Sequence, residues 1–197
     1  MFAFYLLGAI VVTFLAQIIY PPLTGLFVLD PATLAQHPWT LITSMFLHGG
    51  AIHIFFNAFA LFTFGPYLER IIGSMRFLAV YFASGLAGGI AYAATYWFHL
   101  VPASIPALGA SGAIFGVLGA VAVLRPNLQI LMWFVPMPMR VAALVWVALS
   151  LWQTADVSSG IAGAAHLGGL VVGAAMAYLW LKQGSIEWVD ETQHGYY

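Results

Sequence analysis

The chain of 197 residues is 63% hydrophobic and only 6% charged, and its formal net charge is −1. Soluble domains carry about 25% charged residues, so most of the outer surface here is expected to face lipid rather than water. The chain has no run of basic residues that would indicate a nucleic-acid partner. The absence of cysteine excludes disulfides, thiolate metal sites and cysteine-based catalysis.

A spanning helix needs about 20 apolar residues, which leaves room for about six spans joined by short loops. We therefore predict an all-α, polytopic membrane protein. A single domain over residues 1–182 would hold a bundle of six transmembrane helices, and residues 183–197 would form a short cytoplasmic tail.

Prolines and charges separate the expected elements. Residues 2–19 are apolar, without a charged leader or a small-residue cleavage site, and are interpreted as a retained first span rather than a signal peptide. Residues 20–45 are broken by prolines and suit an interfacial loop. The other spans are expected at residues 46–68, 77–98, 111–124, 139–153 and 160–181. Residues 127–139 are apolar but contain two prolines, and we predict a loop at the membrane surface.

The cations predict the orientation of the bundle. They are Arg70, Arg76, Arg125, Arg140 and Lys182. Six spans put all of them on one side, which the positive-inside rule makes cytoplasmic. Both termini are then cytoplasmic. Without a targeting segment, the expected location is a prokaryotic plasma (inner) membrane, with an organelle membrane as the alternative.

Polar side chains within spans are costly and usually functional. Counting about 1.5 Å per residue from the cytoplasmic ends places His53, Asn57, Ser111 and His166 roughly 17 to 22 Å up, and His48 near the outer surface. Four polar groups from three spans therefore share one layer, about 10 Å below the outer surface. Independent packing roles need not coincide in depth, so this layer favours a functional site.

The span at residues 111–124 is only about 21 Å long, so the loop before it must descend into the membrane. Irregular backbone at that depth is tolerated only inside protein or beside a water-filled cavity. The sequence thus predicts a submerged cavity, which intramembrane hydrolysis requires.

Ser111 begins a predicted helix, where free N–H groups favour negative charge, so it is a candidate nucleophile whose own N–H could stabilise an oxyanion. Its base would be His53 or His166, the titratable groups of this layer. The six acids all lie in loops or at span ends, so a Ser-His dyad is expected rather than a triad. His53 and Asn57, spaced i, i+4, could donate hydrogen bonds to the oxyanion.

Each residue also has a simpler interpretation. Ser111 could be a small packing residue, His53 and Asn57 a buried hydrogen-bonding pair, and His166 structural or a haem ligand. Phe115 is expected to wall the cavity. Close helix packing is expected at Gly116, Gly119, Gly169 and Gly173.

Three motifs, in chain order, resemble those of the rhomboid intramembrane serine proteases. They are His48-Gly-Gly-Ala-Ile-His53-Ile-Phe-Phe-Asn57, Gly109-Ala-Ser111-Gly112-Ala-Ile-Phe115-Gly116 and Ala165-His166-Leu-Gly-Gly169-Leu-Val-Val-Gly173. Gly65-Pro-Tyr-Leu-Glu69-Arg70 is also similar to the end of the family's second span. The resemblance covers about residues 1–182, which would be the rhomboid catalytic domain.

This resemblance implies that Ser111 is the nucleophile and His166 the general base. It also implies an oxyanion hole formed by the Ser111 N–H with His53 and Asn57. Supporting roles would fall to His48, Gly109, Gly112, Phe115, Gly169 and Gly173. Members hydrolyse peptide bonds in or near the transmembrane segment of single-span proteins, close to a small residue, without a cofactor or metal.

Lateral substrate entry past the fifth span is a further implication, with Phe56 and Trp152 as candidate gate residues. The chain departs from the family at two positions. Many members carry Trp-Arg where this chain has Trp39-Thr40, which leaves the anchoring of the first loop open. Many bacterial members have Tyr at the position of Phe115.

Two other functions compete with proteolysis. One is an inactive rhomboid-like protein that binds membrane clients. The other is a six-span cofactor binder or transporter with His48, His53 and His166 as haem or metal ligands. Zinc and aspartyl intramembrane proteases fit poorly, because the chain has no HExxH motif and no carboxylate at depth within a span.

Overall fold

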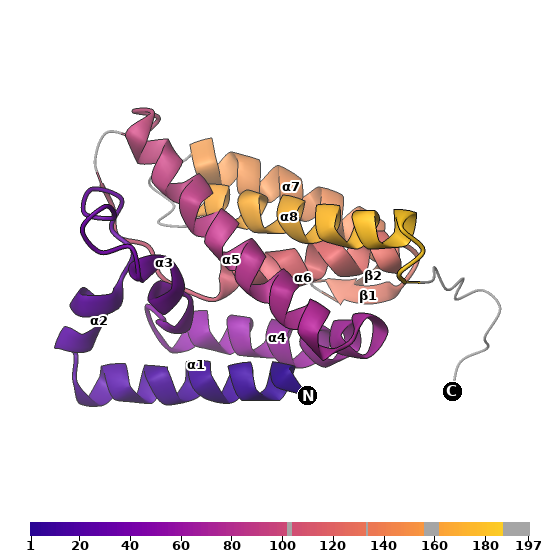
Figure 1. Cartoon of the computed structure of the whole chain (residues 1–197), viewed down its shortest axis with the longest axis horizontal. Coiled ribbons are helices and arrows are strands. Elements are labelled where there is room, and N and C mark those ends of the chain that lie inside the picture. Colours follow the sequence, from indigo (N-terminus) through magenta and orange to yellow (C-terminus); the bar gives the residue numbers. More distant parts are fainter. Residues whose placement is uncertain (102–103, 133, 156–161, 187–197) are drawn as a thin grey trace.

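The computed structural model describes residues 1–101, 104–132, 134–155 and 162–186, which form a bundle of long helices (Figure 1). Four helices are long and apolar enough to cross a membrane: α1 (Phe2–Ile19), α4 (Ala51–Ile72), α5 (Ser74–Trp97) and α8 (Gly163–Lys182). Two apolar helices are shorter, α6 (Ser111–Leu124) and α7 (Met139–Ala155). These helices follow the order of the predicted spans, and the predicted polytopic helical bundle is confirmed.

The boundaries differ most at the second predicted span. Its expected first residues form instead the end of a 3-10 turn, η1 (Ser44–Phe46), and an extended stretch, and α4 begins only at Ala51. The glycine pair at residues 49 and 50 lowers helix propensity just before that start. His48 therefore lies in a loop ahead of the helix and not on it. The interfacial loop contains two short helices, α2 (Pro22–Phe27) and α3 (Thr40–Thr43).

Glu69 is buried near the end of α4, where its carboxylate accepts hydrogen bonds from the start of α1. It accepts hydrogen bonds from the backbone N–H groups of Phe2, at 2.8 Å, and Ala3, at 2.9 Å. The hydroxyl of Ser74 donates to the same carboxylate at 2.6 Å. The first N–H groups of a helix have no partner within the helix and favour a negative charge. Glu69 thus joins α1, α4 and α5 at one end of the bundle.

A small hairpin stands where the sequence predicted a surface loop. Strands β1 (Gln129–Met132) and β2 (Val135–Pro138) pair antiparallel, with Met132 opposite Val135. Both strands are edge strands, so the two prolines of β2 interrupt no further pairing. The Arg140 side chain donates to Asn127 at 2.8 Å, which closes the segment on itself. The segment therefore returns to its starting end, as predicted.

Helix α6 is the buried centre of the bundle and packs most closely on α8. A methyl group at Gly169 would overlap the carbonyl oxygen of Gly112, and one at Gly173 would overlap that of Gly116. Only glycine lets two helix backbones touch in this way. A methyl group at Gly119 would likewise meet the backbone of α8. The close packing expected at all four glycines is present.

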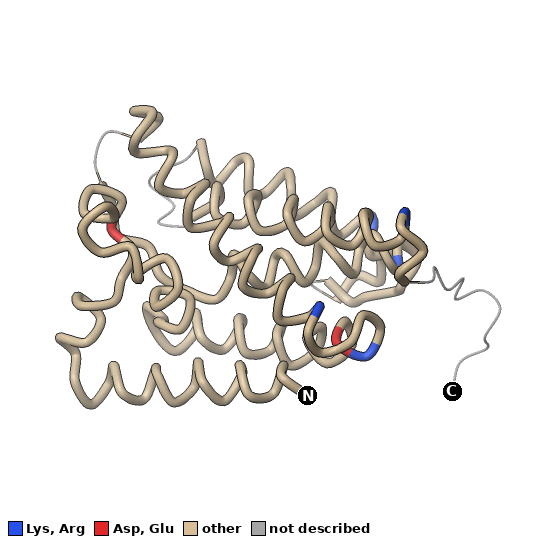
Figure 2. The backbone as a smooth tube through the Cα atoms, viewed as in Figure 1, with Lys and Arg blue, Asp and Glu red and all other residues tan. Residues whose placement is uncertain are grey.

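Charged groups are distributed unevenly along the bundle. Figure 2 shows the lysine and arginine residues gathered at one end, which is also the end of the N-terminus. The end with α2 and α3 carries none of them in the described chain. This one-sided arrangement agrees with the sequence prediction that all the cations share a side.

Candidate active site

Ser111 is the first residue of α6, as predicted. The segment that leads to it is held by backbone pairing with the interfacial loop. Leu29 and Ala107 exchange hydrogen bonds of 3.0 and 2.8 Å, and the Gly109 N–H donates to the carbonyl of Ser44 at 2.9 Å. Non-helical backbone within a membrane needs such internal partners. These backbone hydrogen bonds hold the segment that leads to the candidate nucleophile.

His166 lies in the first turn of α8 and faces Ser111. Its Nε2 is 2.9 Å from the Ser111 hydroxyl oxygen, although 55 residues separate the two in sequence. The imidazole is buried, and it stacks flat on the Phe115 ring with centroids 4.2 Å apart and planes inclined by 3°. The close approach of α6 and α8 at their glycines permits this contact.

The other nitrogen of His166 has a different environment. Nδ1 is buried and has no hydrogen-bond partner within the described part of the chain. In a Ser-His-Asp triad a carboxylate would hold this nitrogen and fix the ring. Here the flat stacking on Phe115 fixes the ring instead.

His53 and Asn57 lie on α4, on the side that faces Ser111. The N–H of Gly49 donates to His53 Nδ1 at 3.3 Å, and the His53 ring lies against Gly109, where a Cβ atom would come within 2.8 Å of Nε2. Asn57 is buried and donates one amide hydrogen to the His53 carbonyl at 3.1 Å. Its second amide hydrogen remains available to a ligand.

These four polar residues border one cavity of about 1170 Å³. The cavity continues past them between α4 and α7 and reaches the hairpin, where Ile130 and Leu131 line it. Its remaining walls are mainly apolar and include Phe56 and Trp146. The candidate gate residue Trp152 is exposed but is not among the lining residues. The polar groups thus stand at one end of a long apolar cleft.

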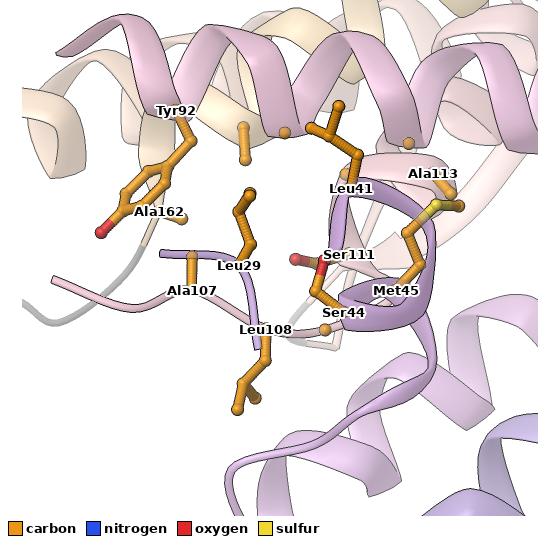
Figure 3. Close-up of a pocket in the computed structure, with 15 residues that line it drawn as sticks. Leu29, Leu41, Ser44, Met45, Tyr92, Ala107, Leu108, Ser111, Ala113 and Ala162 are labelled. Carbon is orange, nitrogen blue, oxygen red and sulfur yellow. The ribbon is translucent and has the colours of Figure 1, made fainter. Parts of the chain in front are cut away.

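A second, small cavity of about 40 Å³ adjoins Ser111 on its other side. Figure 3 shows four residues of the interfacial loop around this space, next to Ser111: Leu29, Leu41, Ser44 and Met45. The volume suits one water molecule or a small side chain.

Sequence reasoning missed two residues that build this site. Asp30 accepts hydrogen bonds from the Ser104 hydroxyl and from the Ala32 N–H, the latter at 3.0 Å. It ties the interfacial loop to the segment before Ser111, which answers how the loop is anchored without the family's arginine. The hydroxyl of Thr40, at the position where many family members carry arginine, donates to the carbonyl of His37 at 2.7 Å.

The second missed residue is Gln17 of α1. Its side chain accepts from the His48 N–H at 2.9 Å and donates to the His48 carbonyl at 3.2 Å. The sequence signal that could have revealed Gln17 is a single amide side chain within an apolar span. The His48 ring is itself buried and lies edge-on to His53, with centroids 5.2 Å apart. Burial, and then the charge of His53, lowers the pKa of His48 to about 4.

Comparisons with known proteins identify the family of the chain. The family model of the Rhomboid domain matches residues 35–183. "Putative rhomboid protease YdcA" from Bacillus subtilis (strain 168) is 35% identical over 145 residues, which cover 74% of this chain and 68% of that protein. "Rhomboid protease GluP" from the same organism is 46% identical over 82 residues, covering 42% and 15% of the two chains.

An inactive protein also occurs among the relatives. "Inactive RHOMBOID-like protein 8" from Arabidopsis thaliana is 34% identical over 82 residues, which cover 42% of this chain and 22% of that protein. The aligned regions of GluP and of this plant protein are thus small parts of longer chains. The match to the Rhomboid domain, by contrast, takes in α4 to α8 and includes His48, His53, Asn57, Ser111 and His166. The chain belongs to the rhomboid family of intramembrane serine proteases.

Proposed function

We propose that this chain cleaves the transmembrane segments of single-span membrane proteins, with Ser111 as nucleophile and His166 as general base. The observation that carries the proposal is the 2.9 Å contact between His166 Nε2 and the Ser111 hydroxyl at the polar end of an apolar cleft. A hydroxyl at this distance from an imidazole can lose its proton as it attacks.

The reaction proceeds in two halves. The Ser111 oxygen bonds to the scissile carbonyl carbon while His166 takes the hydroxyl proton, and the carbonyl oxygen becomes an oxyanion. His166 then gives the proton to the leaving amine as the C–N bond breaks, which leaves an acyl-enzyme. Water, deprotonated by His166, attacks the ester, and the serine oxygen leaves with that proton. The N–H groups of Ser111, His53 and Asn57 are the proposed oxyanion donors.

The apolar lining of the cleft favours a helical, apolar substrate. Its walls between α4 and α7 are mainly hydrophobic, and Phe56 is the gate candidate that lines it. A transmembrane helix entering sideways would replace lipid along these walls and bring a peptide bond to Ser111. The small cavity beside Ser111 suits a small side chain next to the scissile bond.

The charge distribution supports the proposed orientation in the membrane. With the cation-rich end in the cytoplasm, both termini are cytoplasmic and the Ser111 end of α6 opens toward the outer side, in a prokaryotic inner membrane. The proposed catalytic domain is residues 1–182. The proposed cytoplasmic tail is residues 183–197, of which 187–197 lie outside the described chain.

Cleavage of a fluorescent single-span reporter by the purified protein in detergent tests the proposal. We expect Ser111→Ala and His166→Ala to abolish cutting, and the matched controls Ser185→Ala and His37→Ala, away from the cavity, to retain it. Cutting that survives Ser111→Ala would overturn the serine mechanism. A wild type that cuts none of several reporters, yet retains them on affinity resin, would support the client-binding alternative instead.

A further inference from the structure

The proposed mechanism leaves one buried polar side chain of the apolar helix α1 unused. Gln17 is 7% exposed, and burying an amide is costly unless hydrogen bonds compensate it. Its oxygen accepts from the His48 N–H at 2.9 Å, and its nitrogen donates to the His48 carbonyl at 3.2 Å and to the Thr24 hydroxyl at 2.9 Å. One side chain thus fixes both backbone polar groups of His48.

The His48 carbonyl and the Gly49 N–H belong to a single planar peptide group. In a trans peptide these two groups point in opposite directions, so holding the carbonyl also aims the N–H. Gln17 holds the carbonyl, and the N–H donates to His53 Nδ1 at 3.3 Å. The peptide between His48 and Gly49 therefore connects α1 to the His53 ring.

This connection determines which nitrogen of His53 carries the proton. A neutral imidazole has one N–H and one lone pair, and the hydrogen bond made by one nitrogen selects the role of the other. Because Nδ1 accepts from Gly49, the proton sits on Nε2, the nitrogen that lies against Gly109 in the turn before Ser111. The opposite tautomer would present a lone pair there and would repel an oxyanion.

We propose that Gln17 is a positioning residue that sets the tautomer of His53 through the His48–Gly49 peptide, so that an N–H donor faces the developing oxyanion. The inference rests on the proposed protease function, because the oxyanion belongs to peptide hydrolysis. Gln17 precedes the residues matched by the Rhomboid domain, which begin at residue 35, so this role is a property of α1.

Kinetics on the fluorescent reporter provide the first test. Gln17→Met keeps an unbranched chain of similar size but loses both bonds to His48, and we expect kcat to fall about 10- to 100-fold with KM within about twofold, since losing one oxyanion donor costs about 100-fold or more. Thr24→Val is the matched control, because it removes only the third hydrogen bond of Gln17. Its kcat should stay near that of the wild type.

A double-mutant cycle separates positioning from general destabilisation. In the His53→Ala background, Gln17→Met should cause no further loss of kcat, because the group on which it acts is gone. Equal losses in both backgrounds, or an unchanged kcat in the single variant, would overturn the inference. If Gln17→Met does not fold, Gln17→Glu replaces it, since a carboxylate keeps the shape but cannot donate to the His48 carbonyl.

The tautomer itself is observable without any substrate. Nitrogen NMR of protein labelled in histidine, with His53 assigned by its loss in His53→Ala, should show the proton on Nε2 in the wild type and a mixture of tautomers in Gln17→Met. A wild type protonated on Nδ1 would overturn the inference. Because this spectrum needs no catalysis, it stands even if the protein cleaves no reporter, and the two proposals fail separately.

Discussion

At the scale of single residues, the His166 ring depends on a neighbour without charge. Phe115 lies one helical turn after Ser111 and covers one face of the imidazole, with centroids 4.2 Å apart. No hydrogen bond restrains Nδ1 within the described chain, so the orientation of the ring relies on this stacking.

Replacing Phe115 tests this dependence. We expect Phe115→Leu to lower kcat about tenfold or more with little change in KM, because a small misplacement of a catalytic group is costly. Phe115→Tyr should keep nearly full activity. Reporter kinetics measure both, and Phe98→Leu, at the exposed end of α5, is the control. Full kcat in Phe115→Leu would show that stacking does not orient His166.

The lowered pKa of His48 makes the free energy of unfolding depend on pH. Its pKa is about 4 when folded and about 6.5 when unfolded, so the unfolded chain binds more protons between these values. The fold is therefore not penalised above about pH 6.5, and protonation destabilises it as the pH falls toward 4, by on the order of 3 kcal/mol. We expect Tm in detergent to fall less steeply over this range in His48→Gln than in the wild type. An unchanged slope in His48→Gln would contradict the assignment.

At the scale of elements, the dyad distance depends on the contact between α6 and α8. The backbone carbonyls of Gly112 and Gly116 fill the space that a side chain on α8 would need. A backbone atom cannot rotate away as a side chain can, so any added Cβ must separate the helices. Gly169 and Gly173 of α8 therefore position His166 over Ser111, although neither glycine adjoins either residue in sequence.

Gly173→Ala is the sharpest test, since it lies two turns below His166 and touches no substrate. We expect a lower Tm and at least a tenfold loss of kcat, because the two helices move apart at the dyad. Gly8→Ala is the matched control, as nothing surrounds the new methyl group in α1. Wild-type activity and Tm in Gly173→Ala would mean that the backbones are not in contact.

At the scale of the whole molecule, charge and topology agree. The cations lie at one end of the bundle (Figure 2), and the hairpin between α6 and α7 lies at that same end (Figure 1). The interfacial loop with α2 and α3 lies at the opposite end, where Asp30 and Leu29 brace the segment before Ser111 (Figure 1). The site residues on α4, α6 and α8 therefore lie toward the end of the interfacial loop, away from the cations.

The orientation can be measured with single cysteines, because the natural chain has none. In whole bacterial cells, a membrane-impermeant maleimide should label Gln36→Cys, in the exposed interfacial loop, and should label Gln183→Cys only after lysis. The reversed pattern would place the active site on the cytoplasmic side and contradict the positive-inside prediction. Retained reporter cleavage in both variants provides the control for folding.

The sequence by itself determined that the outer surface faces lipid, the order of the helices and the bounds of α1 and α6. These properties are local or additive: a shortage of charge forces apolar faces toward lipid, and the length of each apolar stretch limits where a span can lie. The start of α6 at Ser111 and the non-crossing segment after it were predictable for that reason. The three motifs added the family, because their order along the chain is itself sequence information.

Only the tertiary structure decided between His53 and His166 as the neighbour of Ser111. Residue reasoning left both open, since each lay at a suitable depth, and the choice depends on how closely α8 approaches α6. The hairpin, the position of His48 ahead of α4 and the clamp by Gln17 were also beyond the sequence. Each depends on contacts between distant segments, and a local pattern fixes the face on which a side chain lies but not the partner that will meet it.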